Sequence, residues 1–253
     1  MEGKKKTARK GIYTALMLIC VVVFLFALYN VVDILMEYEE IESYYEITID
    51  EYVEVDDNGM IDTIDLAKLI GKNEDVKGWI YIDGTDINYP LLQGPYNDYY
   101  LYLNYDEEYS GAGSIFIDSD NKGDLSDDHT VIYGHNMKND TMFGTLNDFK
   151  NQSHKEAHPY VYILTPSGKW NKYEIFAYYR CDVEDGTFDL FTENDEKMAS
   201  YIDLVKSKNY YDNSNLPTNG EKVITLSTCT EDLDDWSRNI LQAKLIGTVD
   251  KIQ

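Results

Sequence analysis

The feature that most limits the fold of this chain is an uncharged apolar run near its N-terminus. Residues 11–32 form 22 consecutive positions without Asp, Glu, Lys, Arg or His. A helix of this length spans the roughly 30 Å hydrocarbon core of a bilayer. A cleaved signal peptide is the alternative, but its apolar region is usually about 7–15 residues long and ends at a small-x-small cleavage site. The run therefore predicts a transmembrane signal anchor.

The charges on either side of this run predict its orientation. Five basic residues lie within positions 1–10, whereas four acidic residues lie between positions 33 and 40. Basic flanks stay on the cytoplasmic side of a membrane. We therefore expect residues 1–10 to form a cytoplasmic tail, residues 11–32 to cross the cell membrane once, and the chain after Val32 to be extracellular.

The extracellular part is strongly acidic. Residues 33–253 carry 17 Lys and Arg against 45 Asp and Glu, a formal charge of −28. This balance excludes nucleic-acid binding through the usual phosphate electrostatics. It favours solubility, and the alternative is an acidic groove for a basic substrate tail, which the sequence does not locate.

The pattern of apolar residues divides this part into helical and strand-rich regions. Residues 33–75 are acidic and helix-prone, with a second short helix expected around Ile64 to Ile70, and predict a stalk followed by N-terminal helices. After Thr192, apolar residues at positions 198, 201, 202 and 205 form the stripe of an amphipathic helix.

Residues 76–253 predict a mostly β domain. Its short segments are rich in β-branched or aromatic residues and are bounded by turn formers. They are Trp79 to Ile82, Ile87 to Leu92, Ser114 to Ile117, Thr130 to Tyr133, Tyr160 to Leu164, Lys172 to Tyr179, Lys222 to Leu226 and Leu241 to Gly247. Many short strands with regular turns indicate a sandwich or a closed barrel.

Three residues with chemical potential stand at the ends of these strands. His135 follows one apolar strand through Gly134, and Cys229 closes another. A thiol becomes a nucleophile when a histidine or a cation stabilises its thiolate. Arg238 lies nine positions after Cys229, so it returns beside the thiol if the two strands are antiparallel neighbours, where it could stabilise an oxyanion.

The other cysteines and histidines leave alternatives open. Cys181 could form a disulfide with Cys229 in an extracellular domain. His129 lies in an acidic loop, and His154 and His158 lie in a charged segment where solvent exposure is expected. Spacing alone leaves a generic cysteine hydrolase as an equal candidate.

At this point the chain resembles the sortase family. The segments Tyr133 to Asn136 and Thr225 to Cys229, with Arg238, look like the three sortase signatures, and the region from Gly78 to Leu101 looks like the class B branch. The resemblance implies an eight-stranded sortase β-barrel with N-terminal helices and one helix before the cysteine strand. It covers roughly residues 76 to 249.

The resemblance also implies a role for each residue. Cys229 would attack the carbonyl after a threonine in a C-terminal sorting signal, His135 would transfer protons, and Arg238 would hold the substrate and the oxyanion. The matching positions for substrate binding are Asn97, Leu101, Ser227 and Glu231. The implied partners are surface proteins bearing a sorting signal and an amine of the peptidoglycan precursor. Cys181 would then be a structural thiol.

Two other classes of cysteine enzyme are disfavoured. Papain-like proteases place cysteine before histidine in the chain, and caspase-like enzymes use a different cysteine motif. A pilin-polymerising sortase and a non-catalytic, membrane-anchored binding module are the other candidates. No cofactor is expected, and no metal cluster with ligand-like spacing is visible in the sequence.

Overall fold

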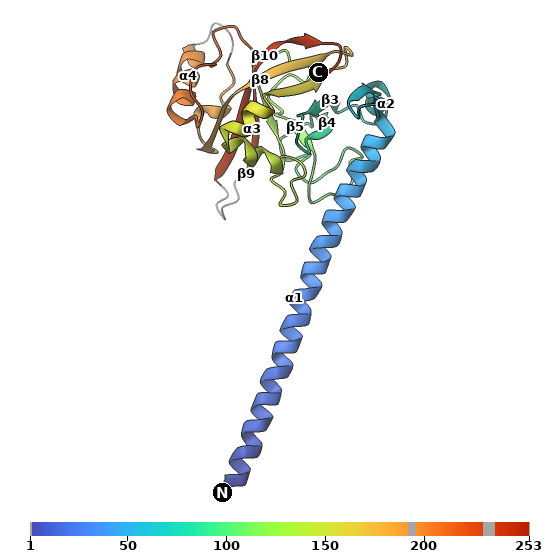
Figure 1. The fold of residues 1–253 in the computed structure, drawn as a ribbon, viewed down its shortest axis with the longest axis vertical. Helices are drawn as coiled ribbons and strands as arrows, with labels where there is room; N and C mark the ends of the chain where they lie inside the picture. The colour runs from blue at the N-terminus through green and yellow to red at the C-terminus, as the bar shows by residue number, and fades with distance from the viewer. Residues whose placement is uncertain (1, 192–195, 230–235, 253) are drawn as a thin grey trace. The chain divides into compact units, whose positions relative to one another are not determined.

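The computed structural model describes residues 2–191, 196–229 and 236–252, which form two compact units. The first unit is Met1–Tyr44 and the second is Tyr45–Gln253. Helix α1 (Glu2–Tyr52) makes up the described part of the first unit and continues into the second (Figure 1).

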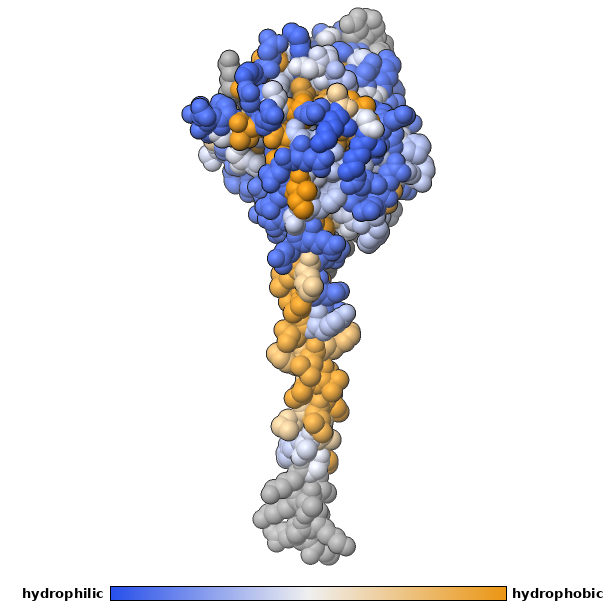
Figure 2. All heavy atoms as spheres, turned by 90° about the vertical axis from the view of Figure 1, so that its right-hand side faces the viewer, coloured by the Kyte–Doolittle hydropathy of each residue, from blue (hydrophilic) through white to orange (hydrophobic). Residues whose placement is uncertain are grey.

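The apolar run forms part of α1 and is open to its surroundings. None of its most apolar window is buried, and the large hydrophobic side chains from Ile12 to Val32 are exposed. Figure 2 shows these residues as an orange band on α1. Since exposed apolar surface of this extent is unfavourable in water, the helix is consistent with the predicted membrane anchor.

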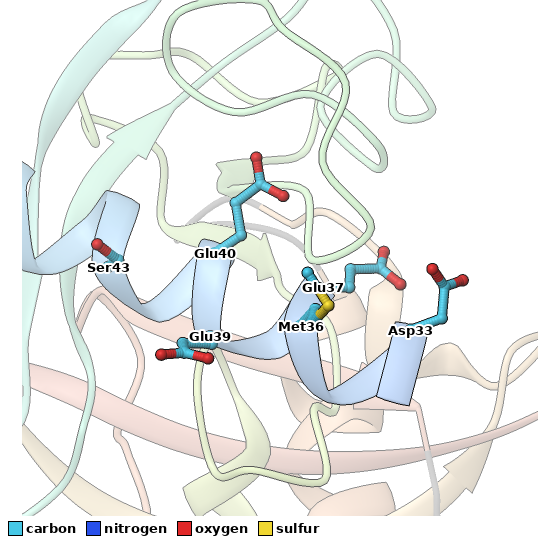
Figure 3. A pocket seen from close by; sticks show the side chains of 6 residues that line it. All are labelled: Asp33, Met36, Glu37, Glu39, Glu40 and Ser43. Carbon is cyan, nitrogen blue, oxygen red and sulfur yellow. The ribbon is translucent and has the colours of Figure 1, made fainter. Parts of the chain in front are cut away.

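The acidic residues that follow the run lie on more than one side of α1. Figure 3 shows Asp33, Glu37 and Glu40 on one side of the helix and Glu39 on another. The first three are spaced three to four positions apart, which places them on one helical face. All four acidic residues, together with Met36 and Ser43, line a shallow pocket on this helix.

The second unit confirms the predicted closed barrel. Its eight strands follow the order β10-β8-β7-β3-β4-β5-β6-β9, in which the β4–β5 and β6–β9 pairs are parallel and the others antiparallel. Figure 1 shows the barrel with α3 and α4 beside its strands. The strands are β3 (Val76–Tyr81), β4 (Asn88–Leu92), β5 (Ile115–Ile117), β6 (His129–Tyr133), β7 (Tyr160–Leu164), β8 (Trp170–Asp182), β9 (Val223–Cys229) and β10 (Ser237–Val249).

The predicted amphipathic helix is α4 (Glu196–Lys208), and its stripe covers one side of the barrel. Met198, Tyr201 and Val205 are buried against residues of β8, β9 and β10, among them Tyr179 and Val223. The helical period therefore aligns the apolar residues with the sheet, as the sequence indicated.

Three short helical elements between strands escaped the sequence prediction, and a fourth did not. The turns η1 (Gly144–Lys150) and η2 (Gly186–Phe188) are 3₁₀ helices. Helix α3 (Gln152–Ala157) buries none of its residues, so it lacks the apolar stripe that reveals a helix in a sequence. Helix α2 (Leu66–Lys72) matches the short helix expected before Gly71.

The predicted first residue of that short helix, Ile64, was wrong. Ile64 belongs to strand β2 (Ile61–Ile64), which forms an antiparallel hairpin with β1 (Val53–Val55). Asp65 then caps α2, accepting a hydrogen bond from the backbone N of Lys68 at 3.0 Å. Because Asp is a strong N-cap, the helix begins after it and not at Ile64.

The placement of His129 in an acidic loop was also wrong. His129 is the first residue of β6 and is fully buried. Its Nδ1 lies 2.8 Å from the Asp189 carbonyl oxygen, and its Nε2 lies 2.8 Å from Thr225 Oγ1. The ring stacks on Phe191 at a centroid distance of 4.9 Å. These contacts make His129 part of the core.

We expect His129 to make the fold sensitive to acid. Burial lowers its pKa from 6.5 to about 4, whereas the unfolded chain keeps the ordinary value. Between these values the unfolded state binds an extra proton, so the free energy of unfolding falls as the pH falls, by up to about 1.4 kcal/mol per pH unit. Urea unfolding of the detergent-solubilised protein at pH 7 and pH 5 measures this loss.

The matched variant for this experiment is His129→Gln, which has no titrating ring. At pH 7 this variant should be less stable than the wild type. The difference between their free energies of unfolding should decrease by up to roughly 2 kcal/mol from pH 7 to pH 5, because only the wild type loses stability through this ring. A deficit that stays constant over this range would show that His129 does not titrate as its burial requires.

Candidate active site

Three strand ends meet at one end of the barrel because of the strand directions. Strands β6 and β9 are parallel, with Tyr133 opposite Ser227, so their C-terminal ends lie at the same edge. Strand β10 runs antiparallel to β9 and begins at this edge, with Arg238 directly opposite Cys229. The antiparallel pairing of β9 and β10, on which the expected return of Arg238 beside Cys229 depended, is therefore present.

A cavity of about 260 Å³ opens at this edge. Five of the residues proposed from the sequence line it: Asn97, Leu101, His135, Ser227 and Arg238. The structure adds five further lining residues: Asp98, Phe116, Tyr133, Gly134 and Thr228. Cys229 ends the neighbouring strand β9, and Glu231 lies outside the described residues.

The imidazole of His135 is held in one tautomer by its surroundings. Its Nε2 lies 2.7 Å from the Leu101 carbonyl oxygen, which can only accept, so Nε2 carries the hydrogen. In the neutral ring Nδ1 then has the free lone pair. The ring also contacts Tyr102 at a centroid distance of 5.6 Å.

The same surroundings set the charge of His135. Burial lowers its pKa below the ordinary value of 6.5, and the hydrogen bond to Leu101 opposes this shift. The neutral ring is therefore the main form at pH 7 in the free protein. A neutral imidazole with an available Nδ1 can take up a proton and return it.

The Leu101 carbonyl, which orients His135, belongs to a loop whose backbone passes close to the backbone at Gly113. A Cβ on Gly113 would lie 2.3 Å from the Leu101 carbonyl oxygen, and Gly113 has φ +58°. Only glycine fits both conditions. The loop is also fastened by Tyr45, whose hydroxyl donates to the Gly113 carbonyl at 2.8 Å.

The chain after His135 is fixed by amide side chains. The Phe143 backbone N donates to the His135 carbonyl at 2.9 Å. Asn147 donates to Asn136 Oδ1 at 3.0 Å and accepts from Asn239 Nδ2 at 2.6 Å. Since Asn136 follows His135 and Asn239 follows Arg238, this relay connects the two segments that carry them.

Cys181 and Cys229 lie on two strands, β8 and β9, that flank the strand of Arg238, β10. Cys181 of β8 pairs with Arg238, which in turn pairs with Cys229, so one strand separates the two cysteines. Cys181 is a free, buried thiol, and burial raises its pKa to about 11. The alternative of a disulfide between Cys181 and Cys229 is therefore wrong, and Cys181 is unreactive at neutral pH.

Arg238 is half-buried at the cavity edge and its positive charge reaches the cavity wall. Its Nη1 donates to the Ser237 carbonyl at 2.9 Å. Burial of the Tyr133 side chain and the neighbouring Asp118 raise the pKa of Tyr133, whereas the positive charge of Arg238 lowers it. The guanidinium is thus close enough to stabilise negative charge that develops in the cavity.

Ser227 presents a hydroxyl that the protein leaves unused. It is 2% exposed, and its Oγ has no hydrogen-bond partner among the described residues. A buried hydroxyl without a partner costs about 1–3 kcal/mol. A bound ligand that hydrogen-bonds to it would remove this cost.

Tyr133 is the cavity residue that sequence reasoning could have found. It is the last residue of β6 and lies two positions before His135, so the strand end that carries the histidine also pointed to it. Phe116 and Asp98 carry no comparable signal, because their approach depends on the β5–β6 pairing and on the loop after β4. Within residues 2–191, 196–229 and 236–252 no group of three or more His, Cys, Asp or Glu could hold a metal ion.

Comparisons with known proteins agree with this architecture. The sortase domain family matches residues 80–246. Sortase B of Listeria monocytogenes is 38% identical over 185 residues, covering 72% of this chain and 73% of that protein. Sortase B of Staphylococcus aureus is 34% identical over 177 residues, covering 69% and 71%.

Solved structures show the same similarity. Sortase B from B. anthracis, in complex with AAEK1, superimposes with a TM-score of 0.70 at 29% identity, covering 83% of this chain and 98% of that one. Sortase B from Clostridium perfringens gives a TM-score of 0.66 at 35% identity, covering 72% and 99%. The chain therefore belongs to the sortase family, as a class B sortase with cysteine transpeptidase activity.

Proposed function

We propose that this sortase cleaves a C-terminal sorting signal after a threonine and transfers the protein to an amine of cell-wall peptidoglycan. Cys229 would be the nucleophile, His135 the proton carrier and Arg238 the oxyanion-stabilising residue. Asn97, Leu101, Ser227 and Glu231 would bind the substrate.

In the acylation step, Cys229 gives its thiol proton to Nδ1 of the neutral His135 ring, and the resulting thiolate attacks the threonine carbonyl carbon. Negative charge develops on the carbonyl oxygen, where the guanidinium of Arg238 stabilises it. The C–N bond then breaks, and protonated His135 gives its proton to the leaving amine. The product is a thioester on Cys229 and a free C-terminal fragment.

In the transfer step, the peptidoglycan amine attacks the thioester carbonyl. His135 takes the amine proton through its Nδ1, and the C–S bond breaks to release the Cys229 thiolate. The Leu101 carbonyl supports this role because it occupies Nε2 and leaves Nδ1 free.

The observation that carries the proposal is the strand register at the cavity. Residues directly opposite in an antiparallel pair lie on one face of the sheet. The antiparallel pairing of Cys229 with Arg238, together with the parallel pairing of Tyr133 with Ser227 two residues before His135 and Cys229, supports the meeting of these three strand ends at one cavity. A cleft of this kind with convergent polar groups is the usual form of an active site.

A peptide-library assay with the full-length protein in detergent tests this function. We expect cleavage after threonine in a subset of peptides, and a candidate amine such as a peptidoglycan cross-bridge peptide should be joined to the released N-terminal fragment. Hydrolysis without transfer, or cleavage at another residue, would contradict the transpeptidation proposed here.

The proposed location follows from α1. We infer a single-pass anchor over residues 11–32, a cytoplasmic tail over residues 1–10, an extracellular stalk with N-terminal helices over residues 33–75, and a catalytic barrel over residues 76–253. Protease added to intact cells should remove the barrel. A barrel that stays protected until the membrane is permeabilised would reverse this orientation.

A further inference from the structure

The Leu101 carbonyl, which orients His135, is held in place by a neighbouring segment, residues 110–114. Backbone N–H groups of this segment donate to the carbonyls on either side of Leu101, each at 3.0 Å: Ser110 N to Tyr102, and Ser114 N to Tyr100. The Leu101 carbonyl between them accepts from Nε2 of His135 at 2.7 Å. The position of residues 110–114 therefore sets the position of the acceptor that orients the ring.

Gly113 packs directly against this acceptor. A Cβ at Gly113 would lie 2.3 Å from the Leu101 carbonyl oxygen and 2.7 Å from the carbonyl oxygen of Tyr100. Contacts this close leave no free space between the two backbones. A shift of Gly113 is therefore passed on to the Leu101 carbonyl.

The position of Gly113 is fixed from helix α1. The Tyr45 hydroxyl donates to the Gly113 carbonyl at 2.8 Å, although the two residues are 68 positions apart in the chain. Tyr45 is 5% exposed, so this hydrogen bond is shielded from water. Buried carbonyls are nearly always hydrogen-bonded, and this bond gives the Gly113 segment one definite position.

The Tyr45 ring is itself held in place. It makes an edge contact with Tyr89 at a centroid distance of 5.0 Å, and the Tyr89 hydroxyl accepts from the Met142 backbone N at 3.1 Å. Met142 has φ +54°, an unfavourable conformation for a non-glycine residue, and it pairs with Asn136, which follows His135. Tyr45 is thus linked to the segment that follows the ring as well as to the one that orients it.

Tyr45 acts on the active site only through these contacts. It is not among the described residues that line the cavity. It is the first residue of the second compact unit and belongs to α1, the same helix that contains the predicted membrane anchor over residues 11–32.

We propose that Tyr45 is a positioning residue for the transfer reaction, because its hydroxyl holds Gly113 and thereby the Leu101 carbonyl. That carbonyl keeps the Nε2 hydrogen of His135 bound and leaves Nδ1 available for proton transfer. This inference rests on the proposed function, because it takes His135 as the proton carrier. A misplacement of about 1 Å can lower a rate roughly 100-fold, so a small shift passed on from Tyr45 is enough to slow turnover. The end of α1 then contributes to catalysis in addition to joining the barrel to the anchor.

The first test removes the Tyr45 hydroxyl alone. Tyr45→Phe keeps the ring that contacts Tyr89. In the full-length protein in detergent, kcat for amine transfer should fall roughly tenfold, whereas KM should stay within about twofold because Tyr45 does not touch the cavity. The matched control is Tyr52→Phe. Tyr52 is a second buried tyrosine of α1, and its ring contacts Tyr105 at a centroid distance of 6.3 Å. This control should keep kcat within about twofold of the wild type.

A second measurement needs no substrate and follows the His135 ring directly. The chain has four histidines, so labelling with ¹⁵N-histidine gives few signals, and His135→Gln identifies the one of interest. The bond to Leu101 protects the Nε2 hydrogen of His135 from exchange with water. Tyr45→Phe should speed this exchange at least roughly tenfold, and Tyr52→Phe should leave it unchanged.

The two readouts together decide the role of Tyr45. Slower turnover with faster exchange in Tyr45→Phe, and neither in Tyr52→Phe, supports it. Either readout at the wild-type level in a folded Tyr45→Phe, or equal changes in Tyr52→Phe, overturns the positioning role. A wild type that transfers no amine contradicts the proposed function, and the exchange rates then judge Tyr45 by themselves.

Discussion

Replacing Cys229 by alanine should abolish transpeptidation and leave the barrel folded. The thioester cannot form without the sulfur, and loss of a covalent nucleophile typically lowers kcat by at least roughly four orders of magnitude. The fold should survive, because β9 is held by its backbone pairing with β6 and β10. Transfer of an amine to a cleavable peptide, followed by mass spectrometry, measures the loss.

The matched control for this variant is Cys181→Ala. Cys181 is buried, and its pKa of about 11 leaves almost no thiolate at pH 7. The control should lose some stability through the smaller side chain and keep its turnover. Activity that survives in Cys229→Ala, or disappears in a folded Cys181→Ala, would assign the nucleophile to the wrong cysteine.

Replacing His135 by glutamine should lower kcat/KM roughly 1,000-fold. The glutamine amide can reach the Leu101 carbonyl and donate the hydrogen bond that Nε2 makes in the wild type, at 2.7 Å. It has no group that carries a proton at neutral pH. The variant therefore separates proton transfer from the packing of the ring, and its melting temperature should stay close to that of the wild type.

His154→Gln is the control for this second experiment. His154 belongs to α3 and contacts Phe149 and His158, away from the residues that line the cavity. Its replacement should leave kcat/KM within about twofold of the wild type. An NMR titration adds a direct check, since burial requires the His135 ring to titrate below 6.5. A higher value would remove the argument for a neutral imidazole in the resting enzyme.

The cavity is specified only in part by local sequence. Runs rich in β-branched and aromatic residues located the eight barrel strands, although β8 and β10 extend several residues beyond their predicted ends. The glycine before His135 indicated a turn at a strand end. Asp118 hydrogen-bonds to two cavity residues, and no such signal pointed to it. Its partners Asn97 and Tyr133 are 21 and 15 positions away in the chain, and nothing in their spacing shows that one oxygen receives both.

Buried polar residues were the main source of error. His129 follows two aspartates in the sequence, and its polar neighbours suggested a loop. In the fold, Thr225 and the Asp189 carbonyl meet both ring nitrogens and so make burial possible. Thr225 and Asp189 lie 96 and 60 positions away, beyond the reach of any local pattern.

The apolar helix, the strand-rich domain and the residues that could carry out acyl transfer were all visible in the sequence, because hydrophobic periodicity and residue chemistry are local properties. The tertiary structure decided which of these residues meet. Parallel pairing of β6 with β9 and antiparallel pairing of β9 with β10 bring His135, Cys229 and Arg238 to one end of the barrel. That convergence depends on long-range backbone pairing, which no single segment of the chain encodes.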